Sequence, residues 1–135
     1  MTRLIPLALL LSATTAHAAQ PINGRWITQE GDALVEIGAC GASTCGRIAR
    51  VLRARPNAPT TDVNNGDAAL RRRPIVGLPV LTDFREDGDA WRGRIYDPRS
   101  GRTYRSVVRR NADGTLRVQG CIAVICRTQT WRAAR

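Results

Sequence analysis

The sequence has no lysine, one histidine and few aromatic residues. The histidine, His17, lies in a segment that we expect to be removed, so the remaining chain offers no imidazole for a Ser-His or Cys-His nucleophile or for a metal site. Three Trp, two Tyr and one Phe leave little for a base-stacking platform. Neither a Gly-rich phosphate loop nor a Gly-x-Ser-x-Gly motif is present. These absences argue against an enzyme and predict no nucleic-acid partner, no metal and no cofactor.

Long apolar runs are also lacking, with one short exception at the amino terminus. Arg3 is followed by the apolar run Leu4–Leu11 and then by small residues that end at Ala18. A basic start, an apolar middle and a small-residue exit are typical of a secretory signal peptide, and the run is too short to cross a bilayer. We therefore predict a leader over residues 1–18, cleaved after Ala18, and one domain over residues 19–135 that is periplasmic or secreted and not transmembrane.

Negative charge is scarce relative to positive charge. All 21 basic residues are arginine, against 11 acidic residues, which gives a net charge of +10, or +9 once Arg3 leaves with the leader. Such a charge favours anionic partners, among them an anionic envelope surface. Exclusive use of arginine is equally compatible with the coding bias of a GC-rich genome, so both interpretations stay open.

Four cysteines are spaced as two identical pairs. Cys40 and Cys45 enclose four residues, and Cys121 and Cys126 enclose four more. In an exported chain this spacing predicts two local disulfides, each bracing a tight turn, although four cysteines allow three pairings. A zinc site formed by both pairs is the alternative.

Alternating apolar and polar residues, separated by turn-forming residues, dominate the rest of the chain. The pattern predicts an all-β fold, a small closed antiparallel up-and-down barrel of about eight strands, with a seven-stranded sandwich as the alternative. One long loop, containing a short helix over Asp67–Arg73, separates the third and fourth strands. The predicted strands span residues 24–28, 33–38, 46–52, 80–85, 91–96, 102–109, 115–121 and 127–132.

Tryptophans mark both ends of the predicted barrel. Trp26 lies in the first strand and Trp131 in the last, and these strands are neighbours once a barrel closes. We expect the two indoles to meet at one end of the barrel with an arginine of the last strand, Arg132, stacked beside them. The Gly-x-Trp start at Gly24 is similar to that of lipocalins and other calycins.

A longer pattern runs along most of the chain. It consists of Gly24-Arg25-Trp26, Cys40-Gly41 with Cys45-Gly46-Arg47-Ile48, Thr61-Asp62-Val63-Asn64-Asn65, Leu70-Arg71-Arg72-Arg73-Pro74-Ile75-Val76-Gly77-Leu78, Gly93-Arg94-Ile95-Tyr96-Asp97-Pro98 with Gly101-Arg102-Thr103-Tyr104, and Arg127-Thr128-Gln129-Thr130-Trp131. Together these motifs resemble one family of exported bacterial proteins, the domain of unknown function 2147. The resemblance implies a calycin-like barrel and an envelope location, and no activity. The pair Cys121 and Cys126 is not a general feature of that family, so the second bridge is predicted from spacing alone.

Two groups of residues are candidates for ligand binding. Positions on the strands that could face the barrel interior are Arg94, Tyr96, Tyr104, Arg127 and Gln129. The long loop adds Asp62, Asn64, Arg71 and Arg73, whose carboxylate, amide and guanidinium groups suit a polar or anionic ligand. Alternatively, Asp62 and Asn64 only cap the loop's own backbone, and the arginines are only solvated.

Taken together, these features predict an exported barrel protein that binds a small apolar or amphipathic anionic ligand. The alternative is an envelope-interaction or structural protein whose barrel is filled by its own side chains, because eight-stranded barrels stand at the border between filled and ligand-holding interiors. The sequence predicts no oligomeric state.

Overall fold

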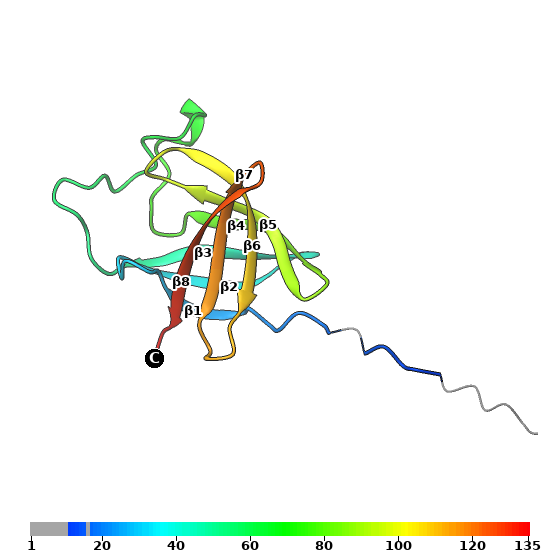
Figure 1. Ribbon diagram of the computed structural model, residues 1–135. Coiled ribbons are helices and arrows are strands. Elements are labelled where there is room, and N and C mark those ends of the chain that lie inside the picture. The colour runs from blue at the N-terminus through cyan, green and yellow to red at the C-terminus, as the bar shows by residue number, and fades with distance from the viewer. Residues whose placement is uncertain (1–10, 16) are drawn as a thin grey trace, which may run out of the picture.

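The computed structural model describes residues 11–15 and 17–135. Most of the predicted leader, residues 1–10 and 16, lies outside the described residues, so the leader and its cleavage site stay predictions. Eight strands follow one another along the chain (Figure 1). They are β1 (Gly24–Ile27), β2 (Ala33–Cys40), β3 (Ser43–Val51), β4 (Pro79–Asp87), β5 (Ala90–Asp97), β6 (Arg102–Arg110), β7 (Leu116–Ile122) and β8 (Ile125–Ala133).

The strands form a closed antiparallel barrel in sequence order, which confirms the all-β, up-and-down prediction. Since successive strands run in opposite directions, alternate turns gather at the same end. The turns after β1, β3, β5 and β7 lie at one end, which we call the open end; those after β2, β4 and β6 lie at the other, the closed end (Figure 1).

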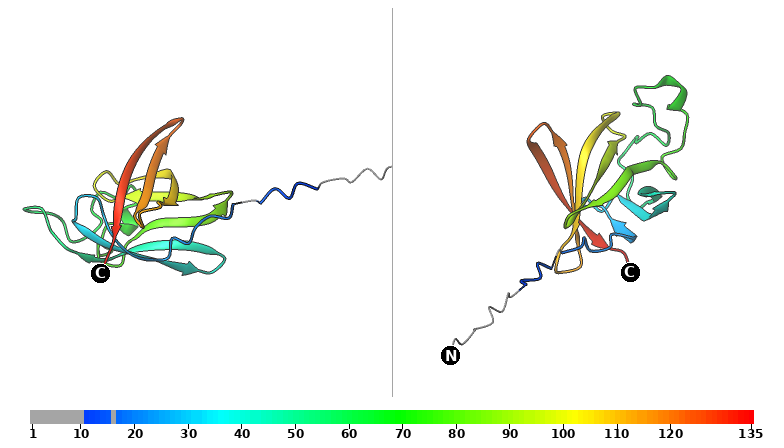
Figure 2. Two further views of the ribbon diagram at one scale, coloured as in Figure 1. Left: turned by 60° about the horizontal axis from the view of Figure 1, so that its bottom comes forward. Right: turned by 90° about the vertical axis from the view of Figure 1, so that its right-hand side faces the viewer.

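Barrel closure rests on a short seam. β1 and β8 pair only at Trp26 with Ala133 and Ile27 with Arg132, whereas β7 and β8 pair from Leu116 with Trp131 to Ile122 with Ile125. Figure 2 shows the consequence: the β7–β8 hairpin stands out from the rest of the barrel at the open end.

One apolar core cluster lies inside the barrel. It is built from alternate positions of the strands, as period-two patterning requires. Trp26 and Trp131 belong to this same cluster and are both almost fully buried, as the sequence predicted.

The closed end is sealed by the segment that precedes β1. Ile22 is 0% exposed and its carbonyl accepts a hydrogen bond from the Trp26 indole nitrogen at 3.0 Å. The Trp91 indole donates to the Gln20 carbonyl at 2.9 Å, which attaches the same segment to β5. The guanidinium above the Trp26 ring belongs to Arg110 of β6, at 5.4 Å from the ring centre. The stacking prediction for Arg132 is corrected here, because Arg132 neighbours the seam but is exposed.

The two predicted disulfides are present, Cys40–Cys45 and Cys121–Cys126. Both brace two-residue turns, but at opposite ends. The first lies at the closed end, in the β2–β3 hairpin, and the second at the open end, in the β7–β8 hairpin.

The long loop between β3 and β4, residues 52–78, lies at the open end and extends to one side of the barrel (Figure 1). Its predicted helix is a single 3-10 turn, Ala68–Leu70, capped by the Asp67 side chain, which accepts from the Ala69 amide at 3.0 Å. Over residues 11–15 and 17–135, no helix has the length and apolar character needed to cross a membrane.

Candidate functional site

A cavity of about 650 Å³ opens at the open end of the barrel. Its deeper wall is apolar and comes from inward positions on β2 to β5 and β7. These wall residues are Ala33, Val35, Ile48, Val80, Ile95 and Val118. Val35, Ile48, Val80 and Val118 also belong to the apolar core cluster, so the core itself forms the inner wall of the cavity.

Trp131 forms part of the lower wall. Its indole nitrogen donates to Gln129 Oε1 at 2.9 Å, so the amide of Gln129 is oriented by the ring two residues away on the same strand face. Gln129, Arg127 and Tyr104 also line the cavity, which places their polar groups above the apolar wall. The cavity is therefore apolar below and polar near its mouth.

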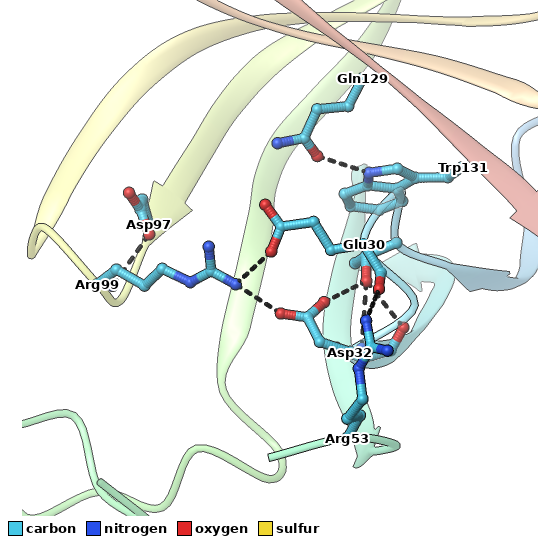
Figure 3. A network of polar contacts seen from close by, with 9 residues as sticks. Glu30, Asp32, Arg53, Asp97, Arg99, Gln129 and Trp131 are labelled. Atoms are coloured by element: carbon cyan, nitrogen blue, oxygen red, sulfur yellow. Dashed lines mark hydrogen bonds and ion pairs between the residues drawn. The ribbon is translucent and has the colours of Figure 1, made fainter. Parts of the chain in front are cut away.

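Across the mouth lies an ion-pair cluster that we call the clasp, made of Arg99, Glu30 and Asp32 (Figure 3). The Arg99 guanidinium contacts Glu30 Oε2 at 2.8 Å and Asp32 Oδ2 at 2.6 Å. Asp32 also accepts from the Thr28 hydroxyl at 2.5 Å. The clasp thereby joins the β1–β2 turn to the β5–β6 turn.

Electrostatics within the clasp stabilise its charged state. The hydrogen bond from Arg99, followed by its positive charge, lowers the pKa of Glu30 below the usual range for glutamate. The same hydrogen bond raises the pKa of Arg99. All three side chains are at least partly exposed to water. The ion pairs of the clasp therefore contribute little to the free energy of folding and weaken as the salt concentration rises.

On the far side of the mouth, β8 has an unpaired edge. Among the described residues, no strand pairs with β8 on the β1 side above Arg132. The Thr130 amide on this edge donates instead to Gln29 Oε1 at 2.8 Å. A side chain thus substitutes for the missing strand, and the cavity opens beside it.

A second polar cluster attaches the long loop to the barrel. Asp62 is 1% exposed, and its carboxylate accepts from Tyr96 Oη at 2.6 Å, from Asn65 Nδ2 at 2.9 Å and from Arg73 Nε at 3.0 Å. Burial raises the pKa of Asp62, but the hydrogen bonds from Tyr96, Asn65 and Arg73 outweigh it, and the pKa is lowered overall. Burial, together with the bond to Asp62, raises the pKa of Tyr96. We call this cluster the loop anchor.

The structure divides the predicted binding residues into three groups. Tyr96, Tyr104, Arg127 and Gln129 line the cavity. Asp62, Asn64, Arg71 and Arg73 instead hold the long loop: Asn64 Nδ2 donates to the Pro98 and Arg99 carbonyls, and Arg71 donates to the Asn65 carbonyl. The prediction that Arg94 faces the barrel interior is corrected, because its side chain is exposed and its neighbour Ile95 lines the cavity.

Glu30, Asp32 and Arg99 were missed by the sequence analysis. They lie between the predicted strands, and Arg99 lies 69 residues from Glu30 in sequence. The available signal was topological: in an up-and-down barrel the turns after β1 and β5 must share an end, so their charged residues face one another. No group of three or more His, Cys, Asp or Glu side chains within residues 11–15 and 17–135 is arranged to hold a metal ion.

Comparison with known proteins agrees with this architecture. The family model described as "Uncharacterized protein conserved in bacteria (DUF2147)" matches residues 24–133. Among solved structures, a protein from the human pathogen Helicobacter pylori, described as belonging to the lipocalin family, is similar with a TM-score of 0.74 and 22% sequence identity. The similarity covers 85% of this chain and 84% of that one, and it shows a shared lipocalin-like fold. No curated protein matches the chain in sequence.

Proposed function

Since the chain belongs to the bacterial family DUF2147, whose description assigns no activity, we propose a function from the site itself. The protein binds a small amphipathic anion, with its apolar part in the barrel cavity and its charged group near the mouth. It is a binding protein and not an enzyme.

The observation that carries this proposal is the cavity at the open end of the barrel. A volume of about 650 Å³ is within the range of roughly 300–1,000 Å³ that small-molecule sites occupy. The wall is aliphatic, with Trp131 at its base, which suits a hydrocarbon or ring system. This volume disfavours the alternative of a barrel filled by its own side chains.

The charge preference follows from Arg127. It lines the cavity and forms no ion pair with any described residue, whereas Arg99 at the mouth is neutralised by Glu30 and Asp32. A guanidinium without a carboxylate partner is suited to a carboxylate or phosphate of the ligand, which it can contact through two N–H groups. Gln129 and Tyr104 add hydrogen-bonding groups beside it.

Dodecanoate and dodecanol test both parts of the proposal, because they share a chain and differ in charge. Binding is measured by titration calorimetry and by the fluorescence of Trp131, with Trp131→Phe identifying the signal. We expect both ligands to bind and dodecanoate to bind about tenfold more tightly, which corresponds to one charge-assisted contact of about 1.4 kcal/mol.

Arg127→Gln and Arg132→Gln provide a matched pair on one strand, since only Arg127 lines the cavity. Arg127→Gln should remove the preference for dodecanoate, and Arg132→Gln should leave it unchanged. Absence of binding by both ligands would contradict the cavity function, whereas equal loss in the two variants would contradict the role of Arg127.

Compartment is proposed on separate grounds. Two disulfides suggest an oxidising environment outside the cytoplasm, as the predicted leader also requires. Mass spectrometry of the protein recovered from its native host would test this, with Ala19 as the expected amino-terminal residue.

A further inference from the structure

The turn of the β7–β8 hairpin is an exposed apolar tip. Ile122 is 63% exposed, Val124 95% and Ile125 73%, and the turn between the two strands consists of Ala123 and Val124. Within the barrel domain, these three are the most exposed large apolar side chains of the described residues. Their concentration in one hairpin marks an interaction site, since apolar side chains exposed singly need no explanation.

This tip is unusual for a two-residue turn. Such turns favour Gly, Asn or Asp, because one or both central residues adopt a positive φ. Ala123 has a φ of 51° where the equivalent turn of the β2–β3 hairpin has Gly41 at 64°. The tip therefore has no residue of the usual turn chemistry, and the Cys121–Cys126 disulfide directly below it holds its shape.

Two arginines flank the tip. The Arg105 guanidinium donates to the Ala123 carbonyl, and Arg127 follows Cys126 on the other strand. Residues 98–135 contain nine arginines and a single acidic residue, Asp113, which lies in the β6–β7 turn at the closed end. No carboxylate of this part of the chain is near the tip.

We propose that the β7–β8 tip docks onto the surface of an anionic phospholipid bilayer. Ile122, Val124 and Ile125 insert to the level of the acyl boundary, and Arg105 contacts lipid phosphates. Exposed aliphatic residues flanked by cations are the combination that a bilayer interface binds, because it supplies apolar burial and negative charge at adjacent depths.

The position of the tip in the barrel agrees with this partner. Ile122 and Ile125 also line the cavity, so docking would turn the cavity mouth toward the lipid. The hairpin stands apart from the other strands, so its tip is open to a partner (Figure 2). The docking inference does not depend on whether the cavity binds a ligand.

The β2–β3 hairpin supplies an internal control. Its turn, Gly41 and Ala42, is also exposed, is also braced by a disulfide, and also has an arginine on a turn carbonyl, from Arg85 to Ala42 at 3.3 Å. It lacks the apolar side chains. Ala42 occupies the turn position that corresponds to Val124.

The test uses the oxidised chain over residues 19–135 and sedimentation with two kinds of vesicle. One is phosphatidylcholine mixed with phosphatidylglycerol, and the other is phosphatidylcholine alone. We expect binding to the mixed vesicles only. Val124→Asp should weaken it about tenfold or more, because a charge replaces an inserted aliphatic group, whereas Ala42→Asp should weaken it less than about twofold.

The depth to which the tip inserts is measured independently with Val124→Trp and Ala42→Trp, each mixed with vesicles of brominated lipid. Quenching of the added tryptophan at position 124 but not at position 42 would support insertion. Thermal unfolding of each variant checks the fold, and Val124→Ser replaces Val124→Asp if the latter fails to fold.

Three outcomes would overturn the proposal. Equal weakening by Val124→Asp and Ala42→Asp would show diffuse charge attraction. Unchanged binding in Val124→Asp would show that the tip is not involved. Concentration-dependent dimers that disappear in Val124→Asp, with no vesicle binding by the unmodified chain, would identify the tip as a self-association surface.

Discussion

The β2–β3 and β7–β8 hairpins share the same cysteine spacing, the same turn length and an arginine on the turn backbone, yet they lie at opposite ends of the barrel. One ends in Gly41 and Ala42 beside a sealed apolar core. The other ends in Ala123 and Val124 beside an open cavity.

This difference shows that the cysteine spacing serves local bracing and says nothing of function. At the closed end, where the segment around Ile22 seals the barrel, the hairpin contributes to a packed structure. At the open end, the same brace holds apolar side chains in water, where they add nothing to packing. Exposed apolar side chains that do not improve packing are expected at a surface that binds a partner.

The largest predicted contrast is between one aliphatic residue at each end. Ile22→Ala should lower the free energy of unfolding by about 3 kcal/mol, because it leaves a cavity in the seal of the closed end. Val124→Ala should change it by less than about 0.5 kcal/mol, since the side chain is exposed. Urea unfolding measures both, and a large cost at Val124 would break the comparison by showing that the tip is packed in solution.

Removal of each disulfide should have similar effects on stability and different effects on binding. Replacing Cys40 and Cys45 with Ser, or Cys121 and Cys126 with Ser, should each cost about 2 kcal/mol, as expected for closing such a short loop. Only the second pair should weaken vesicle binding, because only that bridge holds the apolar tip. Loss of vesicle binding in both variants would point to global unfolding instead.

The loop anchor predicts that the stability of the protein depends on pH through Asp62. Asp62→Asn should cost about 1.5 kcal/mol at neutral pH, because the carboxylate loses charge-assisted hydrogen bonds from Tyr96 and Arg73. The folded state lowers the pKa of Asp62. Its stabilisation is therefore present above the unfolded-state value of about 3.9 and is lost as the pH falls through the lower folded-state value.

Urea unfolding measures the free energy of unfolding of the unmodified chain and of Asp62→Asn between neutral and acidic pH. The difference between the two should fall toward zero in acid. Asp87→Asn is the closed-end control, since its ion pair with Arg92 is exposed and contributes less than about 0.5 kcal/mol. A constant Asp62→Asn difference across the whole pH range would show that shape, and not charge, holds the loop.

The smallest effects concern the turn backbones. Gly41→Ala should destabilise by about 1 kcal/mol, because its φ of 64° is unfavourable for a residue with a Cβ although no atom lies within 4 Å of the added carbon. Ala123→Gly should stay within about 0.5 kcal/mol, because relief at φ 51° is offset by the greater freedom of an unfolded glycine. Urea unfolding of the two variants distinguishes them, and a clear gain in Ala123→Gly would quantify what the apolar turn costs.

Most of the barrel was predictable because its signals are local. Alternation and turn residues placed all eight strands, and the cysteine spacing placed both bridges. The errors at β3 and β8 have one origin: each strand begins nearer the turn than predicted, at Ser43 and Ile125, because the residues between the cysteines continue the strands around a two-residue turn.

The candidate site was predicted only in part, because it is assembled from distant residues. Strand positions that line the cavity, such as Arg127 and Gln129, follow from alternation. The clasp does not, since Glu30 and Arg99 meet only when the barrel closes. Asp62 was expected as a polar group, yet its partner Tyr96 is 34 residues away and redirects it from the cavity to the loop anchor.

By itself, the sequence determined the elements: strand patterning, turn positions, cysteine pairs and an excess of arginine all depend on neighbours along the chain. Only the tertiary structure decided that Arg110 and not Arg132 covers Trp26, that the barrel is hollow at one end, and that the apolar tip borders its mouth. The physical reason is closure, because strand tilt and register fix which residues face one another across a barrel, and no short stretch of sequence encodes that relation.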